Sequence, residues 1–407
     1  MSKKFAPEMR FAGFDSEWER IPITEVFTLR NGYTPSKAVP EYWIGGTIPW
    51  FRMEDIREHG RVLADAIQHV TPEAVKGGGL FPAGSLIVTT TATIGEHALL
   101  IADSQANQQF TVFQTVNRWG SIEKEYWLYR FYQFGDWCRA NTNAGGLAAV
   151  NMDALQKYLI DLPEREERIK IVNFLSNLDN LIEQCSKELT RLEKLKAAML
   201  QKMFPRPGET NPEVRFKGFT GEWETIKLSK IGEAKMCKRV LKSQTTEFGE
   251  IPFFKIGTFG KNPDAYISRY LYEQFKRMYP FPKKGDVIIS AAGTIGRAIV
   301  YDGEPAYFQD SNLIWIDNDN TVVDNCFLAI IVPMINWHSS STTISRIYND
   351  TVRNTSIIIP PSIEEQRTIS RHFRNLDSLI STKRKKLTKL KHIKASCLSK
   401  MFVNIPQ

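Results

Sequence analysis

The sequence predicts an α+β protein built as an internal repeat with pseudo-twofold symmetry. Two mixed α/β domains would be separated by two long helices that form an antiparallel coiled coil. Three observations support this prediction: short motifs occur twice in the same order, two long segments carry apolar residues at heptad spacing, and glycine-opened apolar runs precede both segments. The expected boundaries are 1–160 for the first domain, 161–205 for the first helix, 206–358 for the second domain and 359–407 for the second helix.

The repeat is visible from the first motif onward. "PEMRFAGFDSEWE" starts at Pro7 and "PEVRFKGFTGEWE" starts at Pro212. Four more pairs follow in the same order, while the offset drifts only from 205 to 198 residues: "IPWF" and "IPFF", "TTTATIG" and "SAAGTIG", "NLDNLI" and "NLDSLI", "LQKMF" and "LSKMF". A shared order over this length indicates two copies of one unit. A chain of 407 residues also exceeds what one hydrophobic core usually organises.

The segments before the helices have strand patterns. "GSLIVTT" from Gly84 and "GDVIIS" from Gly285 are apolar, β-branched runs opened by glycine, which is typical of buried strands. "TSIIIPP" from Thr355 predicts another strand, stopped by prolines. We interpret the "TIG" that follows the first two runs as a turn, because glycine there usually serves backbone geometry.

Two helical segments carry an a/d seam over about five heptads each. Proline precedes each helix and acidic residues occupy its first turn, where the helix dipole favours them. Lysine interrupts the seam at Lys196 in the first copy and at Lys383 and Lys394 in the second. The apolar seam positions are Ile171, Leu175, Leu178, Ile182, Cys185, Leu189, Leu192 and Met199, and then Ile369, Phe373, Leu376, Ile380, Leu387, Leu390, Cys397 and Met401.

Connectivity limits how these helices pair. The first leads from the first domain to the second, and the second leads away from the second domain. If both seams pair within one chain, the helices run antiparallel and form a rod with a domain at each end. Pairing between two chains is the alternative that the sequence leaves open.

Composition favours an intracellular protein with an acidic partner. The net charge is +8 and the pI about 9.1, and nucleic acid is the commonest acidic partner. The five cysteines are scattered singly, without a C-x-x-C pair, which predicts a reducing compartment. No signal peptide and no membrane-spanning run is evident, so we expect a cytoplasmic protein with no membrane partner.

No catalytic motif is evident. The sequence lacks a P-loop, an amino-methyltransferase motif and H-x-x-x-H spacing. A loose nuclease-like pattern, Glu213 followed by Glu233 and Lys235, is too degenerate to carry weight, and the other repeat does not keep it. We therefore expect a non-enzyme with no catalytic residue, no metal site and no cofactor of its own.

Polar and basic side chains with aromatic neighbours occur on the loops between strands. Arg and Lys can pair with guanine edges or phosphates, and Asn and Gln with adenine edges. Any one of them is more often a solvated surface residue, but together they favour nucleic acid. The candidate DNA-binding residues are Arg30, Asn31, Tyr33, Lys37, Arg52, Asn107, Gln108, Gln109, Lys238, Arg239, Lys242, Lys255, Lys261, Arg346 and Arg353.

The order of these motifs resembles the specificity subunit of type I restriction–modification systems, over essentially the whole chain. The most specific elements are "P-x-x-R-F-x-G-F" with a following tryptophan, "TIG", and helices that carry "NLD-x-LI" and end in "KMF". The first helix has "EER" at Glu166 where family members commonly show "EEQ", as the second does at Glu364.

The resemblance implies two target-recognition domains that each read one half of a split, asymmetric site in double-stranded DNA. The helices would fix the unread spacer, so that the domains meet major grooves about one helical turn apart or a little more. It also implies two modification (methyltransferase) subunits with S-adenosylmethionine, and restriction subunits (endonuclease and translocase) with ATP and Mg²⁺. Catalysis would belong to those partners.

Two other classes of function remain open. A stand-alone nuclease or modification enzyme would cut or methylate DNA by itself. A coiled-coil scaffold that binds only protein would show no salt-dependent duplex binding.

Overall fold

The computed structural model describes residues 6–116, 124–143, 148–337 and 346–403. Its contacts divide the chain into two compact units. Unit 1 comprises Met1–Lys187 with Lys385–Gln407, and unit 2 comprises Glu188–Arg384. Each unit therefore holds one α/β domain and part of each long helix, and each is described by itself.

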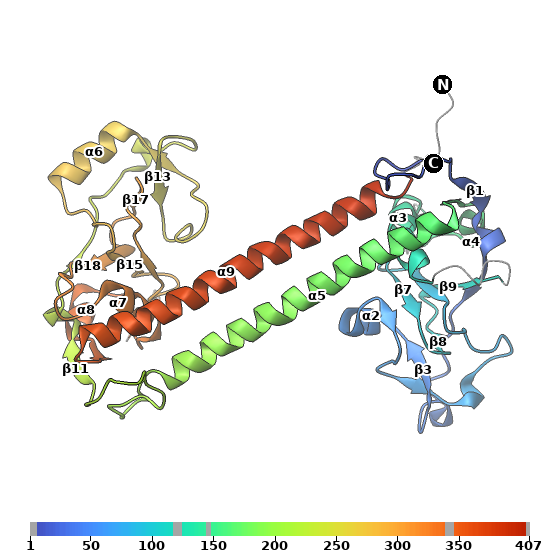
Figure 1. Ribbon diagram of the computed structural model, residues 1–407, viewed down its shortest axis with the longest axis horizontal. Helices are drawn as coiled ribbons and strands as arrows, with labels where there is room; N and C mark the ends of the chain where they lie inside the picture. The colour runs from blue at the N-terminus through green and yellow to red at the C-terminus, as the bar shows by residue number, and fades with distance from the viewer. Residues whose placement is uncertain (1–5, 117–123, 144–147, 338–345, 404–407) are drawn as a thin grey trace. The chain divides into compact units, whose positions relative to one another are not determined.

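Unit 1 is organised around a five-stranded sheet in the order β2-β9-β6-β7-β4, with helix α3 (Lys124–Ala140) packed against it (Figure 1). A three-stranded sheet in the order β5-β3-β8 forms a distal lobe with α2 (Met53–His59), and β1 pairs with β10 beside α1 and α4. The remaining bounds are β1 Glu19–Pro22, α1 Ile23–Val26, β2 Phe27–Asn31, η1 Pro40–Tyr42, β3 Ile48–Phe51, β4 Val62–Leu63, β5 His69–Val70, η2 Pro72–Ala74, β6 Leu86–Thr89, β7 His97–Leu100, β8 Gln105–Ala106, β9 Phe110–Thr115, α4 Met152–Gln156 and β10 Leu159–Leu162.

Unit 2 repeats this topology. Its four-stranded sheet has the order β12-β18-β15-β16, its distal lobe has the order β14-β13-β17, and β11 pairs with β19. The distal lobe carries helix α6 (Arg269–Met278), which Figure 1 shows. Unit 1 has the short η2 at the same point of the element order. The remaining bounds are β11 Glu224–Lys227, η4 Leu228–Lys230, β12 Ala234–Lys235, η5 Lys242–Gln244, β13 Ile251–Phe254, β14 Tyr266–Ile267, β15 Val287–Ser290, β16 Ala298–Val300, β17 Tyr307–Phe308, β18 Leu313–Ile316, α7 Asn325–Ile331, η6 Val332–Met334, α8 Asn349–Asn354 and β19 Ser356–Ile359.

The predicted strands are confirmed as β6, β15 and β19. Side chains alternate between the two faces of a strand, and both faces of these central strands are covered. In β6, Leu86 and Val88 belong to the core that contains α3, and Ile87 belongs to a second core on the opposite face of the sheet. In β15, Val287 and Ile288 likewise belong to two different cores. This is why the sequence shows continuous apolar runs there instead of alternation.

The two long helices are α5 (Arg165–Lys202) and α9 (Ile363–Lys400), each of 38 residues. Every seam position predicted within them is buried or half-buried. Ion pairs join the helices in antiparallel order: Asp179 with Lys394 in unit 1, and Glu193 with Arg384 and Lys196 with Asp377 in unit 2. The antiparallel coiled coil within one chain is confirmed.

The seam lysines have partners that explain them. Lys394 Nζ lies 2.5 Å from Asp179, and Lys196 Nζ lies 2.5 Å from Asp377. Both aspartates belong to the repeated "NLD" motif, so the two pairs are equivalent positions of the repeat. A lysine at an a or d position is costly unless it is paired, and here each copy supplies the partner for the other copy's lysine.

The closing "KMF" motif packs against the repeated tryptophan of each unit. In unit 2, the Phe204 ring lies 5.9 Å from Trp223; in unit 1, the Phe402 ring lies 6.4 Å from Trp18. Each helix thus starts on the domain of its own copy and ends in the core of the other copy's domain.

A buried carboxylate anchors the start of each long helix. Arg10 donates from Nε and Nη2 to Glu167 at 2.7 and 2.8 Å, and Arg215 donates in the same way to Glu365 at 2.7 Å in both bonds. Both glutamates are 1% exposed. The arginine of "R-F-x-G-F" therefore clamps the second glutamate of "E-E-(R/Q)", and planar bidentate pairs of this kind fix orientation strongly.

Candidate nucleic-acid interface

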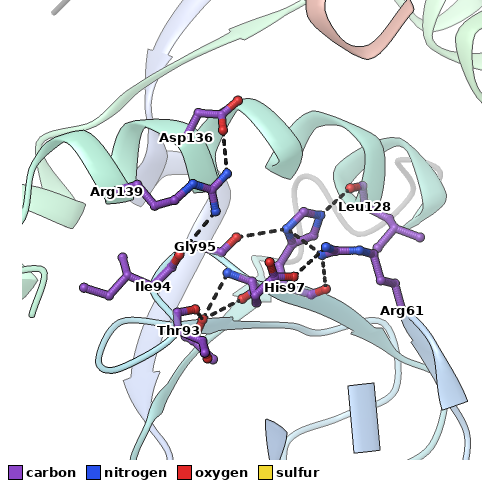
Figure 2. Close-up of polar contacts among 10 residues, drawn as sticks. Arg61, Thr93, Ile94, Gly95, His97, Leu128, Asp136 and Arg139 are labelled. Carbon is purple, nitrogen blue, oxygen red and sulfur yellow. Dashed lines mark hydrogen bonds and ion pairs between the residues drawn. The ribbon is translucent and has the colours of Figure 1, made fainter. Parts of the chain in front are cut away.

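The "TIG" turns have the same construction in both domains, and Figure 2 shows the first. The Thr89 hydroxyl accepts the Glu96 amide at 3.0 Å, and the Ser290 hydroxyl accepts the Arg297 amide at 2.9 Å. The glycine of the motif is required in the first domain. Gly95 has φ +84°, and a Cβ there would collide with the Gly135 carbonyl of α3. The turn is therefore a structural element that fits the hairpin against the helix.

One residue of this turn is strained in the first domain only. Ala92 has φ +62°, a left-handed conformation that disfavours side chains, whereas the equivalent Gly293 has φ +64°. Ala92 lines an open cavity of about 880 Å³ together with Arg57, Arg61 and Arg139.

His97 lies between the sheet and α3 and is 1% exposed (Figure 2). Burial, helped by the positive charge of Arg61, lowers the pKa of His97 to about 3, so the imidazole is neutral. Its Nε2 lies 2.9 Å from the Leu128 carbonyl and donates to it, which leaves Nδ1 to accept from Arg61 at 3.3 Å. Arg61 also pairs with Glu96 at 2.5 Å. These contacts fix β7 to α3; Ala298 occupies the equivalent place in unit 2.

Three loops of the first domain meet at one side of its distal lobe. The Tyr33 amide donates to the Ala106 carbonyl at 2.7 Å, and Lys76 Nζ lies 3.8 Å from the Tyr33 ring centroid. Arg30 donates to the carbonyls of Gly78 and Gly79. The structure thus brings together residues 30–34, 76–79 and 105–109, and uses Arg30 to hold the glycine loop.

The other candidates of the first domain differ in exposure. Lys37, Asn31 and Gln108 are exposed, although the Asn31 side chain accepts from Thr111 at 3.1 Å. Asn107 is 9% exposed and bonds to Gln109, and Arg52 sits over the Trp50 ring and 3.8 Å from Glu54. Their roles in DNA binding stay predictions.

Some candidates of the second domain lie beside β17 and the loop after it, whereas Arg353 lies on α8. Arg239 pairs with Asp310 at 3.1 Å, and Lys238 Nζ lies 4.9 Å from the Tyr279 ring. Arg346 donates to the Ser311 carbonyl at 2.6 Å and to Asn312, so it orders this loop. The others are Lys242, Lys261 and Arg353, which are exposed, and the half-buried Lys255, which pairs with Asp264 at 2.8 Å.

Sequence reasoning missed one feature, helix α6. Its Arg269, Lys276 and Arg277 are exposed, and Tyr270 is 79% exposed. The signal was present: "RYLYEQFKRM" has apolar and charged residues at helical spacing.

The residues of the loose nuclease-like pattern have other partners. Glu213 pairs with Lys202 and Arg206, and Lys235 pairs with Asp317. In the part of the chain that the structure describes, no three His, Cys, Asp or Glu side chains gather as a metal site would require. Over the same residues, no helix is long and apolar enough to cross a membrane.

Comparisons with known proteins agree with this fold and its repeat. The family model of the type I restriction modification DNA specificity domain matches residues 15–194 and 220–392, so the chain belongs to that family. The crystal structure of the type I restriction–modification S subunit from M. genitalium covers 98% of this chain and all of its own, with 14% identity and a TM-score of 0.64, which shows the shared fold.

Two curated relatives are named specificity subunits. The chain is 41% identical to that of the type I restriction enzyme EcoprrI from Escherichia coli, over 46% of each chain. It is 25% identical to that of MjaIX from Methanocaldococcus jannaschii, over 98% of this chain and 96% of the relative. The chain spans less than half the length of the curated relatives that it matches at more than 40% identity.

Proposed function

We propose that this chain is the non-catalytic DNA-reading subunit of a type I restriction–modification complex. Each domain reads one half of an asymmetric bipartite site, and the helices α5 and α9 fix the length of the unread spacer. The candidate residues on the loops of both distal lobes contact the DNA.

One observation carries this proposal: the two domains share the same packing elements, which we call the frame, and differ in their distal lobes. The order of the four shared strands of the main sheet, the "TIG" turn, the Arg–Glu clamp and the Trp–Phe contact are the same in both units. The distal lobes differ in sequence and in the presence of α6. Equal frames suit two copies of one partner, whereas unlike loops suit two different half-sites.

The partners follow from this assignment. Two modification subunits would dock on the repeated frame and methylate adenine with S-adenosylmethionine, and restriction subunits would supply ATP-driven translocation and Mg²⁺-dependent cleavage. The complex would act in the cytoplasm, where the chromosome lies.

Mapping methylated adenines in the host genome, with and without this gene, tests the proposal. We expect methylation at one split, asymmetric motif that disappears with the gene. Unchanged methylation, together with no salt-dependent duplex binding by the chain and its modification subunits, would contradict DNA reading and favour a scaffold that binds only protein.

The spacer function has its own test. Deleting residues 184–190 and 382–388 removes one heptad from each helix, about 10 Å at 1.5 Å per residue, and keeps the seam in phase. We expect the same half-sites with a shorter preferred spacer. A change in the half-sites at an unchanged spacer would show that the helices do not set the distance.

A further inference from the structure

The two distal lobes differ in charge. The segment between β2 and β6, residues 32–85, holds five Lys or Arg and six Asp or Glu. The matching segment between β12 and β15, residues 236–286, holds ten Lys or Arg and five Asp or Glu. Phosphate contacts by Lys and Arg supply the salt-dependent part of DNA affinity, and the segment of the second domain offers twice as many of these cations.

Most of these cations in unit 2 have no carboxylate to neutralise them. Among the described residues, the recorded ion pairs engage three of the ten: Arg239 with Asp310, Lys255 with Asp264, and Arg269 with Glu250. The Arg269–Glu250 pair is 3.4 Å long and exposed on both sides, and exchanging it for a phosphate costs little.

Helix α6 presents part of this charge on one face. The inner face packs on the lobe, with Tyr272 1% exposed and the Phe275 ring 6.0 Å from Tyr307. The outer face carries Arg269, Tyr270, Glu273 and Arg277, at positions i, i+1, i+4 and i+8, which share one side of a helix. Lys276 is exposed at the edge of this face, where its Nζ donates to the Tyr272 hydroxyl at 3.2 Å.

Two aromatic side chains stand exposed beside these cations. Tyr270 is 79% exposed and follows Arg269, and Phe248 is 85% exposed and lies two residues before Glu250, the partner of Arg269. The Thr246 hydroxyl donates to the Phe248 carbonyl at 2.7 Å, so the loop that carries Phe248 is ordered. Proteins that bind duplex DNA can insert apolar side chains such as Phe between base steps beside their phosphate contacts.

We propose that the outer face of α6, with Tyr270 and Phe248, is the element by which the second domain grips duplex DNA. Arg269, Lys276 and Arg277 contact phosphates, and the second domain supplies the larger share of the salt-dependent affinity of the subunit. An α-helix with its side chains is about 10 to 12 Å across, which fits a major groove about 12 Å wide, and α6 with its 10 residues is about 15 Å long. This inference rests on the proposed DNA-reading function.

The test uses the full chain in complex with its modification subunits and a mixed-sequence 30-base-pair duplex, with affinity measured over a series of KCl concentrations. In one variant Arg269, Lys276 and Arg277 are all replaced by Gln. Each lost phosphate contact lowers the slope of log K against log salt by about 0.9, so we expect a drop of about 2 to 3. The affinity at about 0.1 M salt should fall on the order of 10- to 100-fold.

Three matched variants separate charge placement from total charge and from misfolding. Replacing Lys217, Lys227 and Lys230 by Gln removes three exposed cations of unit 2 outside the distal lobe and should leave the slope unchanged. Replacing Lys37, Arg57 and Lys76 of the first domain by Gln should lower the slope of log K against log salt by about 1 or less. Glu273→Gln on α6 should raise the affinity, which a folding defect would not do.

Each remaining outcome is decisive. If the unaltered complex does not bind the duplex, the proposed function itself fails. If it binds and the α6 variant behaves like the Lys217, Lys227 and Lys230 variant, or if the first-domain variant loses as much slope, only this inference is overturned. Loss of the modification subunits from the α6 variant in size-exclusion chromatography would make the face a protein-docking surface and would also overturn it.

Discussion

The two domains of this chain pack their cores and anchor the long helices with equivalent residues, but they expose different surfaces. Both set a sheet under a helix, anchor a long helix through a buried Arg–Glu pair and close their core with a phenylalanine from the other copy's helix. Only the second domain has α6 and a strongly basic distal segment. The difference indicates that the repeated parts are constrained by packing, whereas the distal lobes are not.

The largest expected effect concerns the shared clamp. Glu167→Ala and Glu365→Ala each remove the acceptor of a largely buried guanidinium, which should destabilise the affected unit by about 3 kcal/mol. Glu167 also accepts from the Trp18 indole at 3.1 Å, so its loss should cost about 1 kcal/mol more.

Hydrogen exchange of the second and third turns of α5 and α9, whose amides are bonded within the helix, measures both effects. Glu166→Ala and Glu364→Ala are the controls because their side chains are exposed in the first turns. Equal protection in a clamp variant and its control would show that the bidentate pair is not what anchors the helix.

A pH dependence should distinguish the first domain from the second. The pKa of His97 is lowered to about 3 in the folded protein, against about 6.5 in an unfolded chain. Below pH 6.5 the unfolded chain takes up a proton that the folded domain cannot, so the stability of the first domain falls as the pH drops. Between pH 7 and pH 5 the loss should be about 2 kcal/mol.

Exchange in residues 124–140, corrected for the intrinsic pH dependence of exchange, would measure this loss. His97→Gln keeps a donor for Leu128 and an acceptor for Arg61 and should flatten the profile. Unit 2, with Ala298 at this place, is the internal reference. A slope that survives in His97→Gln would assign it to other groups.

The smallest effect lies in the seam. Double-mutant cycles with Asp179→Asn and Lys394→Gln, and with Asp377→Asn and Lys196→Gln, should give coupling energies of about 1 kcal/mol and a few tenths of a kcal/mol. The first pair is less exposed, at 37% and 19% against 52% and 32%, and therefore less screened by solvent. The reverse order of coupling would show that exposure does not control these pairs.

The sequence by itself determined the parts of this protein that depend on local periodicity. Heptad spacing fixed both helices and their seam, and β-branched runs fixed β6, β15 and β19, because the period of buried positions follows from backbone geometry alone. The motif order fixed the repeat, but it left open whether the two helices pair within one chain or between two chains, and the ion pairs of the structure decided for one chain.

Only the tertiary structure decided which side chains remain free for a ligand. Arg30 and Arg346 hold loops of their own domains, Asn107 is buried, and α6 leaves Arg269, Lys276 and Arg277 exposed. The structure alone also placed Phe204 on Trp223 and Phe402 on Trp18. These outcomes depend on contacts between residues far apart in the chain. Such contacts produce no periodic pattern in the local sequence, so they cannot be predicted from it.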